Sequence, residues 1–154
     1  MKWITRERPK IDRIACPWLV ARFIDNAPEF LYVPAGQVLA EAERLGATPF
    51  DVPGVELGHH GERCSFDAFI DKYHLNDDLH DAALERLAGI VRAADCGHPE
   101  AAPEAPGLLA LARGLALNFS DDHALLAQGM VVYDALYAHC AQAPIDQRPP
   151  IRPR

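Results

Sequence analysis

The sequence lacks the short motifs that mark several large classes of enzyme. It contains no GxGxxG stretch, no Walker loop, no GxSxG elbow and no HExxH pair. Nucleotide hydrolysis, Rossmann-type cofactor chemistry, α/β-hydrolase chemistry and zincin proteolysis therefore find no support. Any chemistry of this chain must be carried by residues in less familiar patterns.

Closely spaced cysteines are also missing. The chain has four cysteines that form no CxxC pair: Cys16, Cys64, Cys96 and Cys140. This spacing argues against a zinc knuckle and against a thioredoxin-like motif. Nothing indicates a secretory context, so we expect four reduced thiols. With 154 residues, the chain is long enough to bury a core without covalent support.

Long apolar runs are absent as well, because Arg, Asp or Gly interrupts each of them well short of a membrane span. The first ten residues, MKWITRERPK, carry charges where a signal peptide would need its apolar centre. We therefore expect a cytoplasmic protein that does not associate with a membrane.

The charge of the chain is negative and unevenly distributed. The net charge is −7, but residues 1–22 hold six basic and two acidic side chains, so they carry +4 and the remainder carries −11. An acidic body disfavours contact with phosphate over a whole face, so we expect no direct nucleic acid binding. The basic segment either holds a small anion, pairs with the acidic body or is a solvated arm.

The hydrophobic pattern predicts an α+β fold, with a small N-terminal sheet and helices followed by a helical C-terminal half. The expected strands are 2–5, 29–34, 47–52 and 55–60, and the expected helices are 16–25, 35–46, 65–75, 77–95, 107–118 and 121–142. Pro17 suits a first helical position, and Gly46 suits a left-handed C-cap. Ser65 and Ser120 suit helix N-caps.

Residues 1–142 are expected to form a single domain, in which the loop 97–106 could join two subdomains. Residues 143–154 contain four prolines, which predicts an extended tail.

The stretch GHHGERCSFDAF, residues 58–69, offers nitrogen, oxygen and sulfur donors in His59, Glu62 and Cys64. Such turns between a strand and a helix often hold ligands. The alternative is a polar turn in which Cys64 is half buried at a helix N-terminus. In either case the helix dipole would lower the pKa of its thiol, so we expect Cys64 to be the most reactive cysteine.

A second histidine lies at the start of an expected helix. His123 begins a helix face that continues through Leu126, Met130, Tyr133, Tyr137 and Cys140. One interpretation is a buried histidine bonded to a backbone carbonyl. Our sharper hypothesis is that His59 and His123 hold one divalent transition metal. Glu62, Cys64 or Asp122 would complete the shell; carboxylate ligands would favour iron or manganese, and Cys64 would favour zinc.

The N-terminal segment TRERPKIDRIACPW interleaves Arg6, Arg8 and Arg13 with acidic residues that include Asp12. Arginine forks bind oxyanions and carboxylates with the same geometry. The segment therefore forms either an oxyanion pocket or an internal network of salt bridges. Cys16, just before Pro17, has a thiol that a helix start could activate.

Three segments together resemble a known family: KWITRERPKIDRIACPWLVARFID, GHHGERCSFDAF and DDHALLAQGMVVYDALYAHC. From about residue 2 to 142, the chain resembles the C-terminal domain of the bacterial chromate-resistance regulator, also labelled the chromate-resistance exported protein family. The matching positions are Arg6, Glu7, Arg8, Asp12, Arg13, Cys16, Pro17, Trp18, His59, Glu62, Cys64, Asp67, Asp122, His123, Tyr133, Asp134 and Tyr137.

The resemblance implies a role in the response to chromate. Full-length regulators of this kind carry a DNA-binding domain before this one, whereas this chain begins at the signature, so we do not expect a stand-alone transcription factor. We expect a domain that binds a metal ion or an oxyanion such as chromate, with a regulator protein as a further partner. The alternatives are a small metal-dependent redox enzyme and an interaction module without chemistry, so enzymatic activity stays open.

Overall fold

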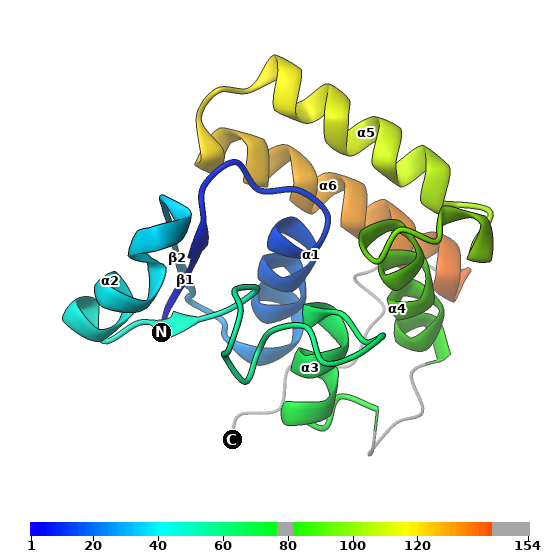
Figure 1. Ribbon diagram of the computed structural model, residues 1–154. Coiled ribbons are helices and arrows are strands. Elements are labelled where there is room, and N and C mark those ends of the chain that lie inside the picture. Colours follow the sequence, from blue (N-terminus) through cyan, green and yellow to red (C-terminus); the bar gives the residue numbers. More distant parts are fainter. Residues whose placement is uncertain (77–81, 143–154) are drawn as a thin grey trace.

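A three-stranded parallel sheet lies beside the N-terminus of the molecule (Figure 1). The structure is a computed structural model that describes residues 1–76 and 82–142. Strand β1 (Lys2–Arg6) is central, between β2 (Glu29–Val33) and β3 (Thr48–Pro49). Parallel strands need crossover connections, and here the chain between each pair of paired strands contains a helix.

Helices make up most of the remaining described chain. They are α1 (Asp12–Leu19), α2 (Val38–Leu45), α3 (Ser65–Lys72), α4 (Ala82–Asp95), α5 (Ala105–Asn118) and α6 (Asp122–Ala141). A π-helical turn (Val20–Ile24) extends α1, and 3-10 turns cover Ala35–Gln37 and Pro99–Ala101. The predicted α+β fold is confirmed. Within the described ranges, no helix has the length and apolar character needed to cross a membrane.

The sheet separates two groups of buried side chains. Trp3 faces the main core, where its ring packs against Phe69 and Tyr73. The next residue, Ile4, faces the other way and packs with Val38 of α2. Successive strand residues point to opposite faces, so one strand serves both cores. Both residues are fully buried, which is typical of a parallel sheet covered on both sides.

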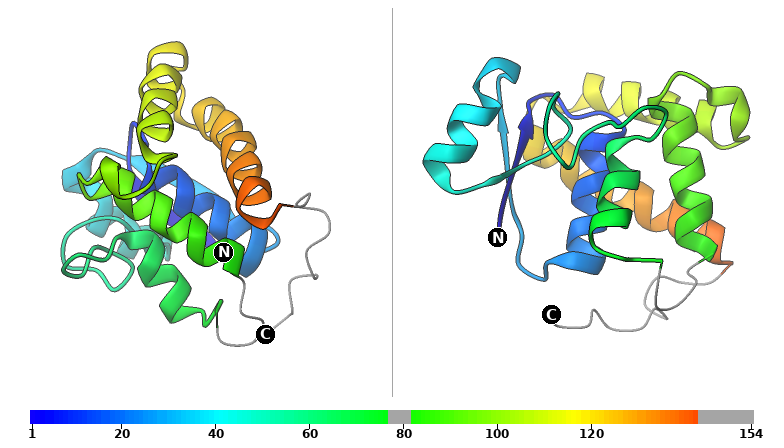
Figure 2. Two further views of the ribbon diagram at one scale, coloured as in Figure 1. Left: turned by 90° about the vertical axis from the view of Figure 1, so that its right-hand side faces the viewer. Right: turned by 60° about the horizontal axis from the view of Figure 1, so that its bottom comes forward.

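Helix α1 occupies the centre of the main core (Figures 1 and 2). It contacts α3, α4 and α6. The contact with α6 is unusually close at Gly129, where an added Cβ would stand 2.3 Å from Cγ2 of Ile14. Glycine at this position lets the two helix backbones approach each other.

The sequence leaves open whether residues 10–15 are an irregular lead-in or a first helical turn before Pro17, and the structure shows the helical turn. The helix begins at Asp12, so Pro17 lies inside it rather than at its first position. An internal proline leaves the carbonyl four residues earlier without its helical partner. That carbonyl belongs to Arg13, and the hydroxyl of Tyr32 donates to it at 3.2 Å. The side chain from β2 thus replaces the missing backbone donor.

Other boundaries also differ from the prediction. Residues 55–60 form turns instead of a strand, with only an isolated bridge between His60 and Arg63. Cys64 replaces Ser65 as the N-cap of α3. Asp121, which accepts from the backbone N–H of Ala124, replaces Ser120 as the N-cap of α6.

One predicted cap is confirmed. Gly46 ends α2 in the left-handed conformation, with φ 61°. Part of the predicted helix 77–95 and the whole predicted tail 143–154 lie outside the described residues.

Candidate functional site

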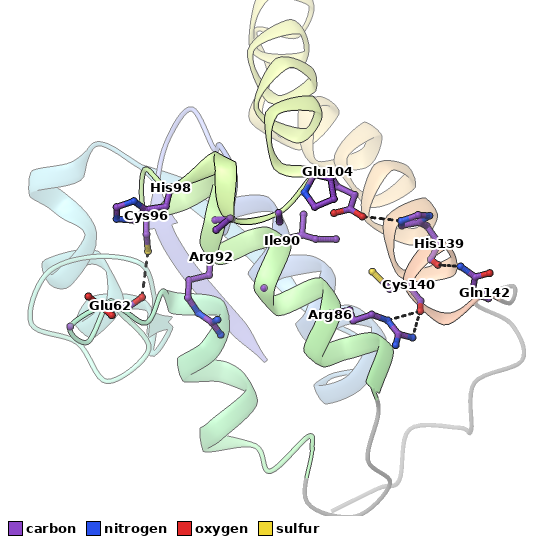
Figure 3. Close-up of a pocket in the computed structure, with 16 residues that line it drawn as sticks. Glu62, Arg86, Ile90, Arg92, Cys96, His98, Glu104, His139, Cys140 and Gln142 are labelled. Carbon is purple, nitrogen blue, oxygen red and sulfur yellow. Dashed lines mark hydrogen bonds and ion pairs between the residues drawn. The ribbon is translucent and has the colours of Figure 1, made fainter.

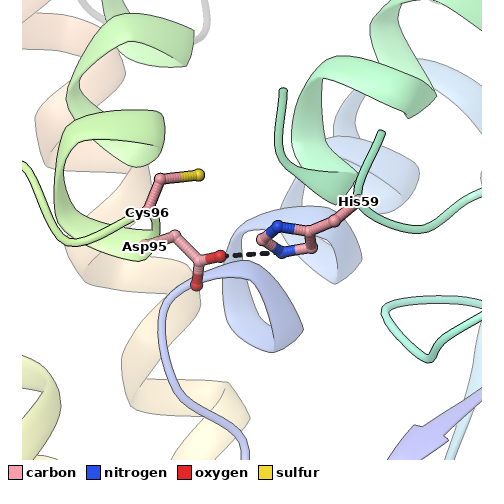
Figure 4. Close-up of side chains that lie close together, drawn as sticks. All are labelled: His59, Asp95 and Cys96. Atoms are coloured by element: carbon pink, nitrogen blue, oxygen red, sulfur yellow. Dashed lines mark ion pairs between the residues drawn. The ribbon is translucent and has the colours of Figure 1, made fainter. Parts of the chain in front are cut away.

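The imidazole of His59 lies among three carboxylates. Its Nε2 is 2.9 Å from Oδ2 of Asp95, 3.3 Å from Oδ1 of Asp51 and 3.5 Å from Oδ2 of Asp12. These side chains come from the start of α1, the loop after β3, the loop before α3 and the end of α4. Figure 4 shows the pairing of Asp95 with His59. Four distant segments therefore converge on one ring.

Asp12 is the most deeply buried of these carboxylates, with no exposed surface. Its Oδ2 accepts from the backbone N–H of Ser65 at 2.7 Å. Its Oδ1 is buried and has no hydrogen-bond partner in the described part of the chain. Burial raises the pKa of Asp12 to about 7, although the hydrogen bond from His59 opposes the rise. An unpartnered buried oxygen of this kind is costly and calls for a physical reason.

Asp51 connects the cluster to two arginines. Its Oδ1 accepts from the Ser65 hydroxyl at 2.7 Å, and its Oδ2 accepts from Nη2 of Arg6 at 3.0 Å. The Nε of Arg13 lies 3.7 Å from the same Oδ2. The backbone of Asp51 is left-handed, with φ 51°, a conformation that aspartate tolerates better than most residues. The turn thereby directs the carboxylate toward both His59 and the arginines.

Protonated His59 is the cation that holds the carboxylates together. The hydrogen bond to Asp12 raises the pKa of His59 to about 9, helped by the charges of Asp95 and Asp51 and opposed by partial burial. Burial and the neighbouring charge of Asp51 also raise the pKa of Asp95. The cluster therefore keeps a positive charge at its centre at neutral pH.

Two triads in the described residues place their ligand atoms within 4.8 Å of one another: Asp12–Asp51–His59 and His59–Asp95–Cys96. His59 belongs to both. Imidazole and carboxylate donors suit manganese, iron and zinc, and a thiolate suits softer ions such as zinc. The arrangement can thus hold a divalent transition metal once His59 loses its proton.

Of the predicted metal ligands, only His59 belongs to these triads. His123 is exposed and its ring packs edge-on against Tyr32, with centroids 5.5 Å apart. The carbonyl of Glu62 lies 3.8 Å from the thiol of Cys96. Asp122 accepts from the backbone N–H of Arg8 at 3.2 Å. The structure does not bring His59 and His123 into a shared site.

Cys64 is fully buried, and its thiol lies 3.5 Å from Asp67. Burial, together with the charges of Asp12 and Asp67, raises the pKa of this thiol far above its usual value. The structure therefore contradicts the expectation that Cys64 is the most reactive cysteine. Burial outweighs the helix dipole, and Asp67, whose Oδ2 accepts from Nε of Arg92 at 2.9 Å, adds a negative charge beside the thiol.

The predicted arginines do not form one anion pocket. Arg6 and Arg13 pair with Asp51, as described above. Arg8 instead binds the end of α5, where its guanidinium donates to the carbonyls of Ala116, Phe119 and Ser120. All three arginine side chains therefore make internal contacts, as in the second interpretation of this segment.

Three of the predicted supporting residues lie in the core beside the cluster. Cys16 is fully buried, and burial raises the pKa of its thiol. The hydroxyl of Tyr133 donates to the carbonyl of Ile11 at 3.2 Å. Tyr137 packs against Trp18, with ring centroids 5.6 Å apart. Asp12, the fourth, is part of the cluster itself.

Sequence reasoning missed Asp51 and Asp95. Asp51 lies in a loop that matches no ligand spacing, so no local pattern marks it. Asp95 carries a weak signal, because it is the last residue of α4 and a carboxylate there opposes the helix dipole. An acidic residue at the C-terminus of a helix, where it is electrostatically unfavourable, indicates that its carboxylate interacts with another segment of the chain.

A cavity of about 960 Å³ lies between α4 and the C-terminal end of α6, and it reaches Cys96 beside the cluster (Figure 3). Cys96 is part of its wall and also belongs to the second triad. The remaining wall mixes apolar side chains such as Ile90 with the charged groups of Arg86, Arg92 and Glu104. The cavity provides access from solvent to the Cys96 side of the cluster.

Comparisons with known proteins agree on one family. A family described as "ChrB, C-terminal domain" matches residues 3–140. Protein ChrB of Cupriavidus metallidurans is 34% identical over 138 residues, which cover 90% of this chain and 40% of that protein. The chain thus spans well under half the length of this relative. No solved structure matches the chain significantly.

Proposed function

This chain belongs to the family of the ChrB C-terminal domain, and from this premise we propose that it binds a divalent transition metal in the response to chromate. The metal would be held by His59 and the carboxylates of Asp12, Asp51 and Asp95. The domain would act in the cytoplasm with a regulator protein as partner.

The observation that carries the proposal is the unpartnered, buried Oδ1 of Asp12, a carboxylate whose other oxygen, Oδ2, lies 3.5 Å from Nε2 of His59. Buried polar atoms are nearly always hydrogen-bonded, and buried carboxylates are paired or bind metals. A divalent ion would supply the missing partner. It would also replace the proton that now makes His59 the cation of the cluster.

The charge of the site favours a cation over a free oxyanion. When all three carboxylates are ionised and His59 is neutral, the two guanidinium groups of Arg6 and Arg13 leave the site with a net charge of −1. Both guanidinium groups are already engaged by Asp51. A bound divalent ion would change the net charge to +1. Chromate would then bind as a ligand of the ion, and only to the metal-loaded protein.

The donor types support manganese, iron or zinc as the ion. One imidazole with several carboxylates suits each of them, and the Irving–Williams order favours zinc over the other two at equal availability. The structure offers an additional donor in the thiol of Cys96.

Metal analysis of the purified, reloaded protein tests the proposal. We expect about one ion per chain for the wild type and loss of that ion in His59→Ala and in the isosteric variant Asp12→Asn. Glu62→Gln is the matched control, because Glu62 lies outside both triads. Equal metal content in all four proteins would refute the proposed site.

A further inference from the structure

We propose that Cys96 is the oxidation-sensitive ligand of this centre, so that oxidation of its thiolate by a hydroperoxide releases the metal. The inference rests on the proposed metal-binding function and deepens it in two ways. It adds the sulfur of Cys96 to the ligand set. It also names a chemical signal, oxidation by a hydroperoxide, that releases the metal.

The position of Cys96 places its sulfur on the open side of the cluster. Its Sγ, a carboxylate oxygen of Asp95 and a ring nitrogen of His59 lie within 4.8 Å of one another. Figure 4 shows the side chains of Asp95 and Cys96 both directed toward the histidine ring. The two residues are adjacent at the end of α4, where Gly97 turns the chain with φ 78°. One helix end can therefore present a hard and a soft donor to the same ion.

The unpartnered oxygen of Asp12 is a second, independent sign of a ligand at this place. Asp12 belongs to the other triad, and His59 is common to both. One ion bound to a nitrogen of His59 could therefore draw further ligands from either triad. The soft thiolate would shift the preference of the site toward zinc.

Access distinguishes Cys96 from the other cysteines. Cys16, Cys64 and Cys140 are buried, whereas Cys96 is partly exposed. Cys96 also lines the cavity of about 960 Å³ (Figure 3), which is ample for a small oxidant. Redox-sensing cysteines combine thiolate character with access to solvent. A coordinated divalent ion deprotonates the thiol, and the cavity supplies the access.

The oxidation step is a two-electron transfer. The thiolate sulfur of Cys96 attacks one oxygen of the hydroperoxide, the S–O bond forms and the O–O bond breaks. The leaving hydroxide or alkoxide takes the proton of the transferred oxygen, which gives water or an alcohol and leaves a sulfenate on the protein. The sulfur is oxidised and the peroxide is reduced. The ion loses its thiolate ligand and dissociates more readily, and an added thiol reductant restores the site.

Cobalt substitution tests whether Cys96 is a ligand. A cobalt–thiolate bond gives an intense charge-transfer band in the near ultraviolet. We expect this band in the Co²⁺-loaded wild type and in Cys140→Ser, and its absence in Cys96→Ser. Cys140 is the matched control, because it lines the same cavity but belongs to neither triad. We expect Cys96→Ser to bind Zn²⁺ on the order of 10- to 100-fold more weakly.

Zinc release tests the redox step. Hydrogen peroxide is added to Zn²⁺-loaded protein in the presence of a chromogenic chelator, and mass spectrometry locates the added oxygen. We expect release from the wild type and from Cys140→Ser, oxidation at Cys96, and recovery of binding after reduction. Cys96→Ser should release no additional zinc when peroxide is added.

The metal centre and the redox role of Cys96 can be refuted separately. If the wild type binds neither Zn²⁺ nor Co²⁺, the metal centre itself is refuted, and this inference with it. If the wild type and Cys96→Ser bind zinc equally, with no charge-transfer band and equal release, the inference is refuted and the metal centre of His59 and the carboxylates stands.

Discussion

Gly129 of α6 lies so close to Ile14 of α1 that a Cβ on the glycine would stand 2.3 Å from Cγ2 of the isoleucine. No real side-chain contact is that short, so any larger residue must push the two helices apart. Ile14 is two positions after Asp12, at the start of the same helix. Helix packing and the candidate metal centre are therefore mechanically connected.

Gly129→Ala should destabilise the protein. Overpacking of a well-packed core costs about 1–3 kcal/mol. Gly114→Ala is the control, because its new methyl group would meet nothing within 4 Å and alanine favours a helix. Urea denaturation of both variants measures the difference. A Gly129→Ala protein as stable as Gly114→Ala would contradict the close approach of α1 and α6.

Tyr32→Phe should destabilise the protein through the carbonyl of Arg13, which loses its donor. An unsatisfied, partly buried carbonyl costs about 1–3 kcal/mol. In a Pro17→Ala background the backbone N–H returns, so the same tyrosine change should cost less. A double-mutant cycle by urea denaturation measures this coupling. Strict additivity of the two changes would show that Tyr32 does not compensate for the proline.

Arg8→Ala should lower stability without affecting an oxyanion site. The guanidinium donates to three carbonyls at the end of α5, and its loss should cost about 1–3 kcal/mol. Arg113→Ala, an exposed change on the same helix, is the control and should be neutral. Thermal melts with and without sulfate separate the cases. Undiminished stability of Arg8→Ala, combined with loss of a sulfate effect, would favour the anion pocket instead.

Asp67 should make the protein sensitive to acid. Burial raises the pKa of Asp67, but the Arg92 guanidinium outweighs burial and holds the pKa below its usual range. A depressed folded pKa adds stability above the unfolded pKa of about 3.9. That stability is lost as the pH falls through the folded value. The difference in unfolding free energy between wild type and Asp67→Asn should thus be largest at neutral pH and shrink below about pH 4.

Urea denaturation at several pH values measures this difference. Asp71→Asn, which alters an exposed carboxylate paired with Arg63, should retain the wild-type pH profile. A constant gap between wild type and Asp67→Asn from neutral to acidic pH would contradict the assignment.

Metal binding should stabilise the fold. An ion that binds only the folded state at 100 times its dissociation constant adds about 2.7 kcal/mol. We expect Zn²⁺ to raise the melting temperature of the wild type, and a chelator to reverse the rise. His59→Ala should show no such shift. An equal shift in both proteins would place the ion elsewhere.

Local patterns predicted the elements better than their ends. The strand expected over residues 2–5 and the left-handed cap at Gly46 depend on local features, and both were found. The position of Pro17 was misjudged because the hydroxyl that compensates for its missing N–H belongs to Tyr32, which lies on β2. Residues 55–60 have the composition of a strand but find no strand partner for pairing.

The candidate site was harder to predict because it is a product of tertiary structure. His59 was recognised by its residue type, and Asp12 only as a supporting residue. Asp51 and Asp95 lie in unrelated segments, and no spacing connects them to the histidine. His123 lies on a regular helix face and looked equally suitable, yet it packs against Tyr32. The sequence predicts which side chains can act as metal ligands, but it does not predict which of them meet in one site.

Because the proposed ligands lie in four separate segments, the order of their synthesis determines when the chain can bind the metal. The last of them, Asp95, enters the chain after α3 and most of α4 have been synthesised. Before Asp95 is synthesised, a nascent chain attached to the ribosome has β1 and α1 but only part of the proposed ligand set. Binding of the proposed metal would therefore be a late event, and a bound ion would show that the seven helices and strands from β1 to α4 have been synthesised and packed. Shortened products that end before α4 would lack Asp95 and therefore the complete set of proposed ligands.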